Sequence, residues 1–261
     1  MNILFIGDIV GKPGRHAAAN LLSVVKDRYR IDYTIANGEN SAGGYGITPD
    51  IARSLLSMGI DLITTGNHIW EHKEIIPYLS ESDTIVRPLN ISPLAPGKGI
   101  AVIQKPGVQP LAVVNLIGRV FMPPAECPFY TATSALAAIA RDYPAVNHIL
   151  VDFHAEATSE KQALGWFLDG KVTSLFGTHT HVQTSDEVIL PQGTSYITDA
   201  GMTGVIDGIL GMDKEQIIPR FTTSVQRHAD VAAGKEELQG VVVRTDDKGK
   251  SLSMVRIKEQ L

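Results

Sequence analysis

The sequence predicts an α/β fold with two β-sheets in a single domain. In the first half of its 261 residues, short apolar runs alternate with stretches of helical periodicity, which is typical of parallel β–α–β units. The last part changes character, because two β-prone runs flank the hairpin turn Asp246-Asp247-Lys248-Gly249. No repeat, low-complexity tract or linker interrupts the chain, so we expect one domain that spans residues 1–261.

The first elements follow from periodicity. The apolar run 2–6 ends at Gly7-Asp8 and predicts a buried strand. Residues 15–29 carry apolar side chains at helical spacing and predict an amphipathic helix. The run 33–36 predicts the second strand. These three elements form the first expected β–α–β unit.

The later elements follow from turn and cap signals. A glycine-rich loop at 38–46 precedes Thr48-Pro49, where Thr48 caps a helix and Pro49 lies in its first turn. The next strand is expected at 62–65. Further strands are expected at 112–116, 148–153, 172–176 and 194–198, and the hairpin strands at 238–244 and 251–257.

Composition limits the class of protein. Hydrophobic residues make up 44% and charged residues 20%, as in soluble globular proteins. No apolar run is long enough to span a bilayer, and Asp8 interrupts the N-terminal run, which argues against a signal peptide. The single cysteine, Cys127, excludes an intrachain disulfide, so we expect a cytoplasmic protein without a membrane partner. A net charge of -5 without a Lys/Arg cluster argues against stable nucleic-acid binding.

Polar clusters follow five of the predicted strands. The pair His179-x-His181 places two imidazoles two residues apart, and residues i and i+2 share a face in an extended chain. Because ligand sites in α/β folds lie beyond the carboxyl ends of strands, the clusters predict one shared site. The candidate metal ligands are Asp8, Glu39, Asn40, Asn67, His154, His179 and His181.

Each cluster alone has an ordinary structural explanation. Asp8 is a candidate helix cap, and Glu39 with Asn40 fits turn chemistry. Asn67 fits a tight turn, and an isolated His154 is more often hydrogen-bonded than metal-bound. The combination of five clusters at five strand ends favours a metal site.

The number of donors predicts two metal ions. One tetrahedral ion uses three or four ligands, whereas seven donors and a solvent oxygen suit two ions ~3.5–4 Å apart. Two dications ~3.5 Å apart at an effective dielectric constant of ~20 repel by roughly 19 kcal/mol, so an anionic bridge is required. Glu39 is the candidate bridge. Oxygen and nitrogen ligation without thiolate fits Fe, Mn, Zn or Co.

His68 directly follows Asn67 at the rim of the expected site. It is a candidate metal ligand, structural histidine or proton donor. We favour the proton donor, because a histidine there can protonate a leaving alkoxide. We therefore treat His68 as the candidate catalytic residue.

The glycine-rich segment 201–213 has two interpretations. It is either a loop that shapes the mouth of a pocket or a structural turn that packs against the second sheet. The sequence identifies no substrate-binding residue.

Together these motifs resemble those of the calcineurin-like metallophosphoesterases and, more closely, the YmdB family of bacterial phosphodiesterases. The resemblance covers nearly the whole chain. Two departures from the broad superfamily are shared with the YmdB family: Asp8-Ile9-Val10 replaces Asp-x-His, and Glu39 replaces a bridging aspartate. The matching strings include Asn2-Ile-Leu-Phe-Ile-Gly-Asp8, Asn37-Gly-Glu-Asn40, Gly66-Asn-His68, Asp152-Phe-His-Ala-Glu-Ala-Thr-Ser-Glu160, Gly177-Thr-His-Thr-His-Val-Gln-Thr184 and Asp207-Gly-Ile-Leu-Gly-Met-Asp213.

The resemblance implies a metallophosphoesterase-type sandwich of two mixed β-sheets flanked by helices. By position, it implies one metal held by Asp8, Glu39, Asn40 and His181. A second metal would be held by Glu39, Asn67, His154 and His179, with Glu39 as the bridge and His68 as the catalytic histidine. Of the two divalent or trivalent transition metal ions, Fe or Mn are favoured over Zn and Co. The resemblance also implies a homo-oligomer.

The expected function is metal-dependent phosphodiester hydrolysis by metal-activated hydroxide. The resemblance implies cyclic nucleotides as substrates, 2′,3′-cyclic and also 3′,5′-cyclic, together with simple phosphodiesters. Two alternatives remain at this point. One is a phosphomonoesterase or nucleotidase on the same scaffold, and the other is a regulatory nucleotide-binding protein with slow turnover.

Overall fold

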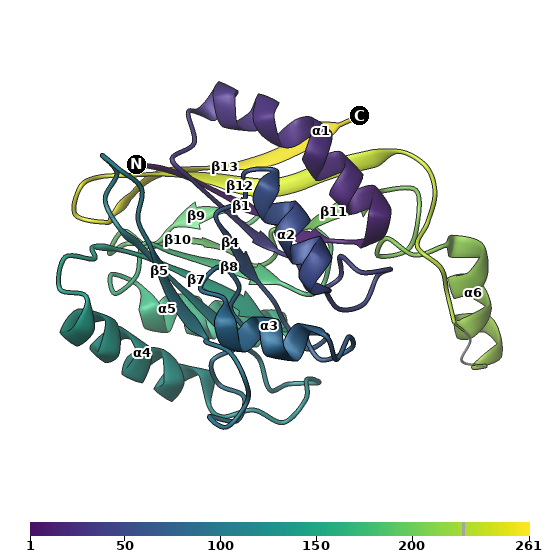
Figure 1. Cartoon of the computed structure of the whole chain (residues 1–261), viewed down its shortest axis with the longest axis horizontal. Coiled ribbons are helices and arrows are strands. Elements are labelled where there is room, and N and C mark those ends of the chain that lie inside the picture. The colour runs from purple at the N-terminus through teal and green to yellow at the C-terminus, as the bar shows by residue number, and fades with distance from the viewer. Residues whose placement is uncertain (226–227) are drawn as a thin grey trace.

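The computed structural model describes residues 1–225 and 228–261 and contains two β-sheets packed face to face, with helices on the outer face of each (Figure 1). The strands are β1 Asn2–Ile6, β2 Asp8–Ile9, β3 Tyr33–Asn37, β4 Leu62–Thr64, β5 Ile100–Ile103, β6 Leu111–Ile117, β7 His148–His154, β8 Ser174–Thr178, β9 Val188–Ile189, β10 Ser195–Ile197, β11 Met202–Val205, β12 Glu236–Thr245 and β13 Ser251–Gln260. The helices are α1 Gly11–Tyr29, α2 Pro49–Ser57, α3 Ile75–Glu81, α4 Pro128–Asp142, α5 Thr158–Leu168 and α6 Lys214–Thr223.

Both sheets are mixed, as the family resemblance implies. The first has the order β2-β11-β12-β1-β3-β4, with β13 paired to β12. In it, β1 runs parallel to β3 and antiparallel to β12. The second has the order β5-β6-β7-β8-β10-β9, in which β6, β7, β8 and β10 are parallel and the edge strands β5 and β9 are antiparallel.

In strand β1, residues 3–6 form a continuous apolar run. Ile3 and Phe5 point into the core between the sheets, where the Phe5 and Phe176 ring centroids lie 5.0 Å apart. Leu4 and Ile6 point the other way, into the core beneath the helices. Because both faces of the strand are buried, neither set of positions is polar.

Helices α1, α2 and α3 cover the first sheet, and α4 and α5 cover the second (Figure 1). The helix expected at 15–29 begins earlier, at Gly11. Pro13 is tolerated there because the backbone N–H groups of the first turn have no partner within the helix. Thr48 caps α2 as expected and accepts a hydrogen bond from the Ile51 N–H at 3.3 Å.

The strand expected at 172–176 is displaced by two residues. β8 begins at Ser174 and ends at Thr178, because its pairing with β7 runs from Leu150–Ser174 to His154–Thr178. The strand therefore ends directly before His179. The other predicted strands agree with the structure to within about two residues at most boundaries, and the hairpin strands extend further.

No helix in the described part of the chain is long and apolar enough to cross a membrane.

Candidate metal centre

The seven predicted ligands come from both sheets and meet at one end of the sandwich. Asp8 lies in β2, Glu39 and Asn40 follow β3, and Asn67 follows β4. His154 is the last residue of β7, and His179 and His181 follow β8. The side chains of Asp8, Glu39 and His154 are completely buried.

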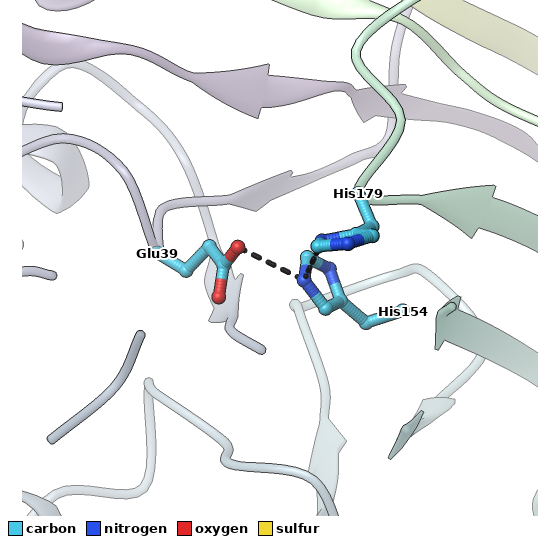
Figure 2. Close-up of side chains that lie close together, drawn as sticks. All are labelled: Glu39, His154 and His179. Carbon is cyan, nitrogen blue, oxygen red and sulfur yellow. Dashed lines mark hydrogen bonds and ion pairs between the residues drawn. The ribbon is translucent and has the colours of Figure 1, made fainter. Parts of the chain in front are cut away.

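Three atoms that could bind a metal lie close to one ring nitrogen of His154. Its Nε2 lies 2.9 Å from Glu39 Oε1 and 3.1 Å from His179 Nδ1 (Figure 2). The same nitrogen lies 3.0 Å from Asn67 Oδ1. One ring N–H can donate in only one direction, so three such short contacts are more than a proton explains. Ligand atoms of Glu39, His154 and His179 all lie within 4.8 Å of one another, which fits a metal ion.

A second set of donors adjoins the first through Glu39. Asn40 Nδ2 lies 3.3 Å from Glu39 Oε1 and 3.1 Å from His181 Nε2. A half-turn of this amide presents its oxygen, the ligating atom, to the same place. His181 Nε2 lies 3.8 Å from Asp8 Oδ1, which is buried and has no hydrogen-bond partner in the described chain. A buried carboxylate oxygen without a hydrogen-bond partner calls for an explanation, and beside Glu39 and His181 a bound cation is the one that fits the neighbouring ligand atoms.

The charges of the cluster also fit cations. Burial would raise the pKa of the Glu39 carboxyl, but His154 and His68 hold it at about 2. Burial would lower the pKa of His154, but Glu39, Asp8 and Asp152 raise it to about 9. Burial, reinforced by His154, lowers the pKa of His179 to about 3. Burial raises the pKa of the Asp8 carboxyl, although His181 and His154 oppose the rise. The Glu39 carboxylate therefore pairs directly with the His154 imidazolium, and a metal ion would replace the proton on His154 Nε2.

Asp152 and Thr178 orient the His154 ring through its other nitrogen, Nδ1. The Thr178 hydroxyl donates to Asp152 Oδ1 at 2.7 Å, so it accepts from His154 Nδ1 at 2.9 Å. This fixes a proton on Nδ1 and turns the other ring nitrogen toward the ligands, as in many histidine metal sites. Burial raises the pKa of Asp152 to about 7, while donors from Asn37, Thr64 and Thr178 favour its ionised form.

The turn that carries His179 and His181 is held by a buried ion pair. Both histidines have positive φ, +94° and +62°, an unfavourable conformation for non-glycine residues. Asp199 Oδ2 accepts hydrogen bonds from the Thr180 N–H at 3.1 Å and from its hydroxyl at 2.6 Å. Lys161 Nζ, almost fully buried, lies 3.0 Å from the same oxygen. The pair thus compensates for the strain of the turn.

Position 66 must be glycine because the side chains of Glu39 and His154 lie very close to its backbone. A Cβ atom there would lie 2.3 Å from His154 Nε2 and 2.4 Å from Glu39 Oε2. Only glycine lets the chain pass between β4 and Asn67 this close to the ligands.

His68 lies at the rim, as predicted, with its side chain 27% exposed. The backbone N–H of His68 donates a hydrogen bond to Glu39 Oε2 at 3.0 Å, and its ring nitrogen Nδ1 lies 3.4 Å from Glu71 Oε1. With Glu39, Asn40, His179 and His181 it opens onto a pocket of about 480 Å³. In the segment 201–213, Ile209, Leu210 and Met212 line this pocket, as the first interpretation expects. The other interpretation is wrong in its detail, because 202–205 form strand β11, which pairs with β12 in the first sheet.

Sequence reasoning missed the supporting residues Asp152, Lys161 and Asp199. Asp199 carried a usable signal, because it follows the predicted strand 194–198 as the ligand clusters follow theirs. Asp152 lies two residues before His154, where alternation places both on one face of β7. Lys161 carried no signal, since lysine in a helix is normally exposed.

Comparison with known proteins agrees with this architecture. The family described as YmdB-like protein matches residues 4–257. A protein of Bacillus subtilis (strain 168) named 2′,3′-cyclic-nucleotide 2′-phosphodiesterase is 51% identical over 250 residues, which cover 96% of this chain and 93% of that protein.

Two solved structures superpose closely. A hypothetical protein from Thermus thermophilus has a TM-score of 0.92 and 40% identity, over 100% of this chain and 99% of that one. A novel phosphatase from Mycoplasma pneumoniae has a TM-score of 0.92 and 33% identity, over 100% of this chain and 93% of that one.

Proposed function

Since this chain belongs to the YmdB-like family, we propose that it is a metal-dependent phosphodiesterase whose substrates are 2′,3′-cyclic nucleotides. The convergence of Glu39, Asn67 and His179 on His154 Nε2 supports the proposal, because this cluster could hold a cation and two of its members, Glu39 and His179, line the pocket. The name of the Bacillus subtilis relative, at 51% identity, supports the substrate class. We also propose that residues 1–261 form one domain and that 3′,5′-cyclic nucleotides and simple phosphodiesters are further substrates.

Two transition metal ions would occupy the centre, Fe or Mn before Zn and Co. Asp8, Glu39, Asn40 and His181 would hold one, and Glu39, Asn67, His154 and His179 the other, with Glu39 as the bridge. When bound, such ions supply positive charge for the phosphate oxygens and lower the pKa of water. Oxygen and nitrogen donors without thiolate suit these ions.

His68 would then serve as the proton donor. With Nδ1 facing Glu71, its Nε2 has no partner in the described chain and would carry the proton for the leaving group. In hydrolysis of a 2′,3′-cyclic nucleotide, water forms a P–O bond and the P–O2′ bond breaks. O2′ takes the proton from His68 Nε2, water loses one proton to solvent, and the product is a nucleoside 3′-phosphate. The Glu39 carboxylate keeps the His68 backbone at the rim.

A phosphomonoesterase is the second candidate, because the Mycoplasma pneumoniae structure is described as a phosphatase. The two activities differ in whether the enzyme accepts a phosphate with three non-ester oxygens and one ester bond, as in a monoester, or one with two of each, as in a diester. A phosphomonoesterase would release inorganic phosphate from 3′-AMP.

The test is a product analysis with protein loaded with Mn²⁺ or Fe²⁺. We expect 2′,3′-cyclic AMP to be converted to 3′-AMP, with no further release of phosphate. Faster phosphate release from 3′-AMP than turnover of the cyclic substrate would favour the phosphomonoesterase. No turnover of any phosphoester by metal-loaded protein would overturn the proposal.

A further inference from the structure

The pocket above the metal centre has two unlike sides. The polar part of its lining, which we call the floor, consists of Glu39, Asn40, His68, Glu156, His179, Thr180 and His181. The remaining part, which we call the α6 wall, is mainly apolar and consists of Gly44, Tyr45, Ile209, Leu210, Met212, Ile217, Arg220 and Phe221. A volume of about 480 Å³ lies within the range typical of small-molecule sites. The floor alone accounts for a phosphate group, and the α6 wall has no role in the chemistry proposed above.

Helix α6 turns one face toward the pocket. Ile217, Arg220 and Phe221 have the spacing i, i+3 and i+4, which places them side by side on a helix. The helix lies to one side of the two-layered body (Figure 1). Asp213 caps it by accepting from the Gln216 N–H at 3.0 Å, and the Gln216 side chain pairs with Asp230.

Two apolar side chains of the wall are unusually exposed. Phe221 is 81% exposed and Leu210 is 48% exposed. In the part of the chain that the structure describes, the Phe221 ring has no aromatic partner, whereas Tyr45 packs edge-on against His68 with centroids 5.1 Å apart. A flat apolar ring at the mouth of a polar pocket suits a ligand with a flat apolar face.

Arg220 is the only lysine or arginine among the lining residues that the structure describes. Within the described residues, its Nε has no hydrogen-bond partner and its guanidinium forms no ion pair. Arg220 is half-buried and lines the pocket, and a guanidinium offers only donors, so it suits a ligand with hydrogen-bond acceptors. Arg220 and Phe221 both line this pocket, so a ligand in it meets a guanidinium and an apolar ring.

We infer that the α6 wall binds the nucleoside part of the substrate, with the base stacked on Phe221 and Arg220 donating hydrogen bonds to the polar edge of the base. Every nucleobase has a flat π face and ring or carbonyl acceptors, so both features are met by one ligand class. The phosphate would occupy the floor. This inference rests on the proposed phosphodiesterase activity and adds that nucleotides are preferred over base-free phosphodiesters.

The test compares two substrates with the same five-membered cyclic phosphate. Ethylene phosphate lacks a base, whereas 2′,3′-cyclic AMP carries one. In Phe221→Ala, the ratio of kcat/KM for 2′,3′-cyclic AMP to that for ethylene phosphate should fall about 5- to 150-fold, which is the range of base–aromatic stacking. Arg220→Gln should lower the same ratio, and Phe221→Trp should preserve it.

Tyr130→Ala is the matched control, because Tyr130 on α4 is 78% exposed and lies outside the pocket lining. It should leave the ratio unchanged. Binding without turnover provides an independent measurement. By calorimetry, Phe221→Ala should weaken binding of 3′-AMP in the same range and leave binding of inorganic phosphate unchanged.

The outcomes separate this inference from the proposed function. Wild-type protein that hydrolyses both substrates, with an unchanged ratio and unchanged 3′-AMP binding in Phe221→Ala, would overturn the nucleoside subsite alone. Wild-type protein that hydrolyses neither would overturn the proposed function, and the 3′-AMP titration would still decide whether the α6 wall binds a nucleoside.

Discussion

The side chains of the candidate metal centre are fixed by the two central sheets, whereas those of the α6 wall rest on a small peripheral core. Asp8, Glu39 and His154 are completely buried at strand ends. Four residues of the wall, Tyr45, Ile209, Met212 and Ile217, form a small apolar cluster with Ala229 and Val231. Rigid strands suit groups that must hold cations at fixed distances, and a lightly packed helix suits groups that accommodate ligands. The two regions should therefore respond differently to mutation.

The largest effect is expected for Glu39→Gln. Because Glu39 touches both ligand sets, its loss should release both metals, each of which contributes several kcal/mol to catalysis. We expect kcat/KM for 2′,3′-cyclic AMP to fall by roughly 10⁵-fold or more. Elemental analysis and kinetics check this prediction. The control is Glu81→Gln, an exposed carboxylate at the end of α3, which should keep metal and activity. Full metal content in Glu39→Gln would show that the bridge is assigned wrongly.

The next largest effect is expected for His68→Ala. Loss of a general acid lowers kcat by roughly 10²–10⁴-fold, here with metal content unchanged. The fall should be smaller for bis-p-nitrophenyl phosphate, whose leaving group needs little protonation. His16→Ala, at an exposed position paired with Glu236, is the control. Equal losses on both substrates would contradict the acid role, and loss of metal would make His68 a ligand.

A stability effect is expected for Lys161→Met. It leaves Asp199 buried without its cation, which typically costs about 3–5 kcal/mol. Because Asp199 holds the turn of the two histidines, metal affinity should also fall by roughly 10–100-fold. Denaturant unfolding and metal titration measure the two effects. Lys248→Met, in the exposed hairpin turn, should change neither. A lower free energy of unfolding with unchanged metal affinity would mean that the ion pair stabilises the fold without positioning the metal ligands.

The smallest effect is expected for Ile217→Ala, which removes a central contact of the peripheral core. Global unfolding should change by less than ~1 kcal/mol, because α6 can open on its own, while hydrogen exchange of α6 amides accelerates. Phe5→Ala, in the core between the sheets, should cost about 3–5 kcal/mol. Comparable losses in the two variants would show that the wall and the floor form one cooperative unit.

The floor was largely predictable from the sequence, and the wall was not. Each ligand follows an apolar run, so local patterns identify Asp8, Glu39 and His154 before their contacts are known. Lys161 and Arg220 depend on packing that brings distant segments together, and a lysine or arginine in a helix normally predicts an exposed side chain. The role of segment 201–213 could not be predicted from the sequence, because its strand pairing and its pocket contacts involve different parts of the chain. Local sequence patterns therefore predict the candidate metal ligands but not the residues of the α6 wall.

The most direct measurement is anomalous X-ray diffraction at the absorption edges of Mn and Fe on crystals of metal-loaded protein. Two peaks should appear in the pocket floor, one beside Asp8, Asn40 and His181 and the other beside Asn67, His154 and His179, with Glu39 between them. A single peak, or peaks away from Glu39, would contradict the dinuclear centre.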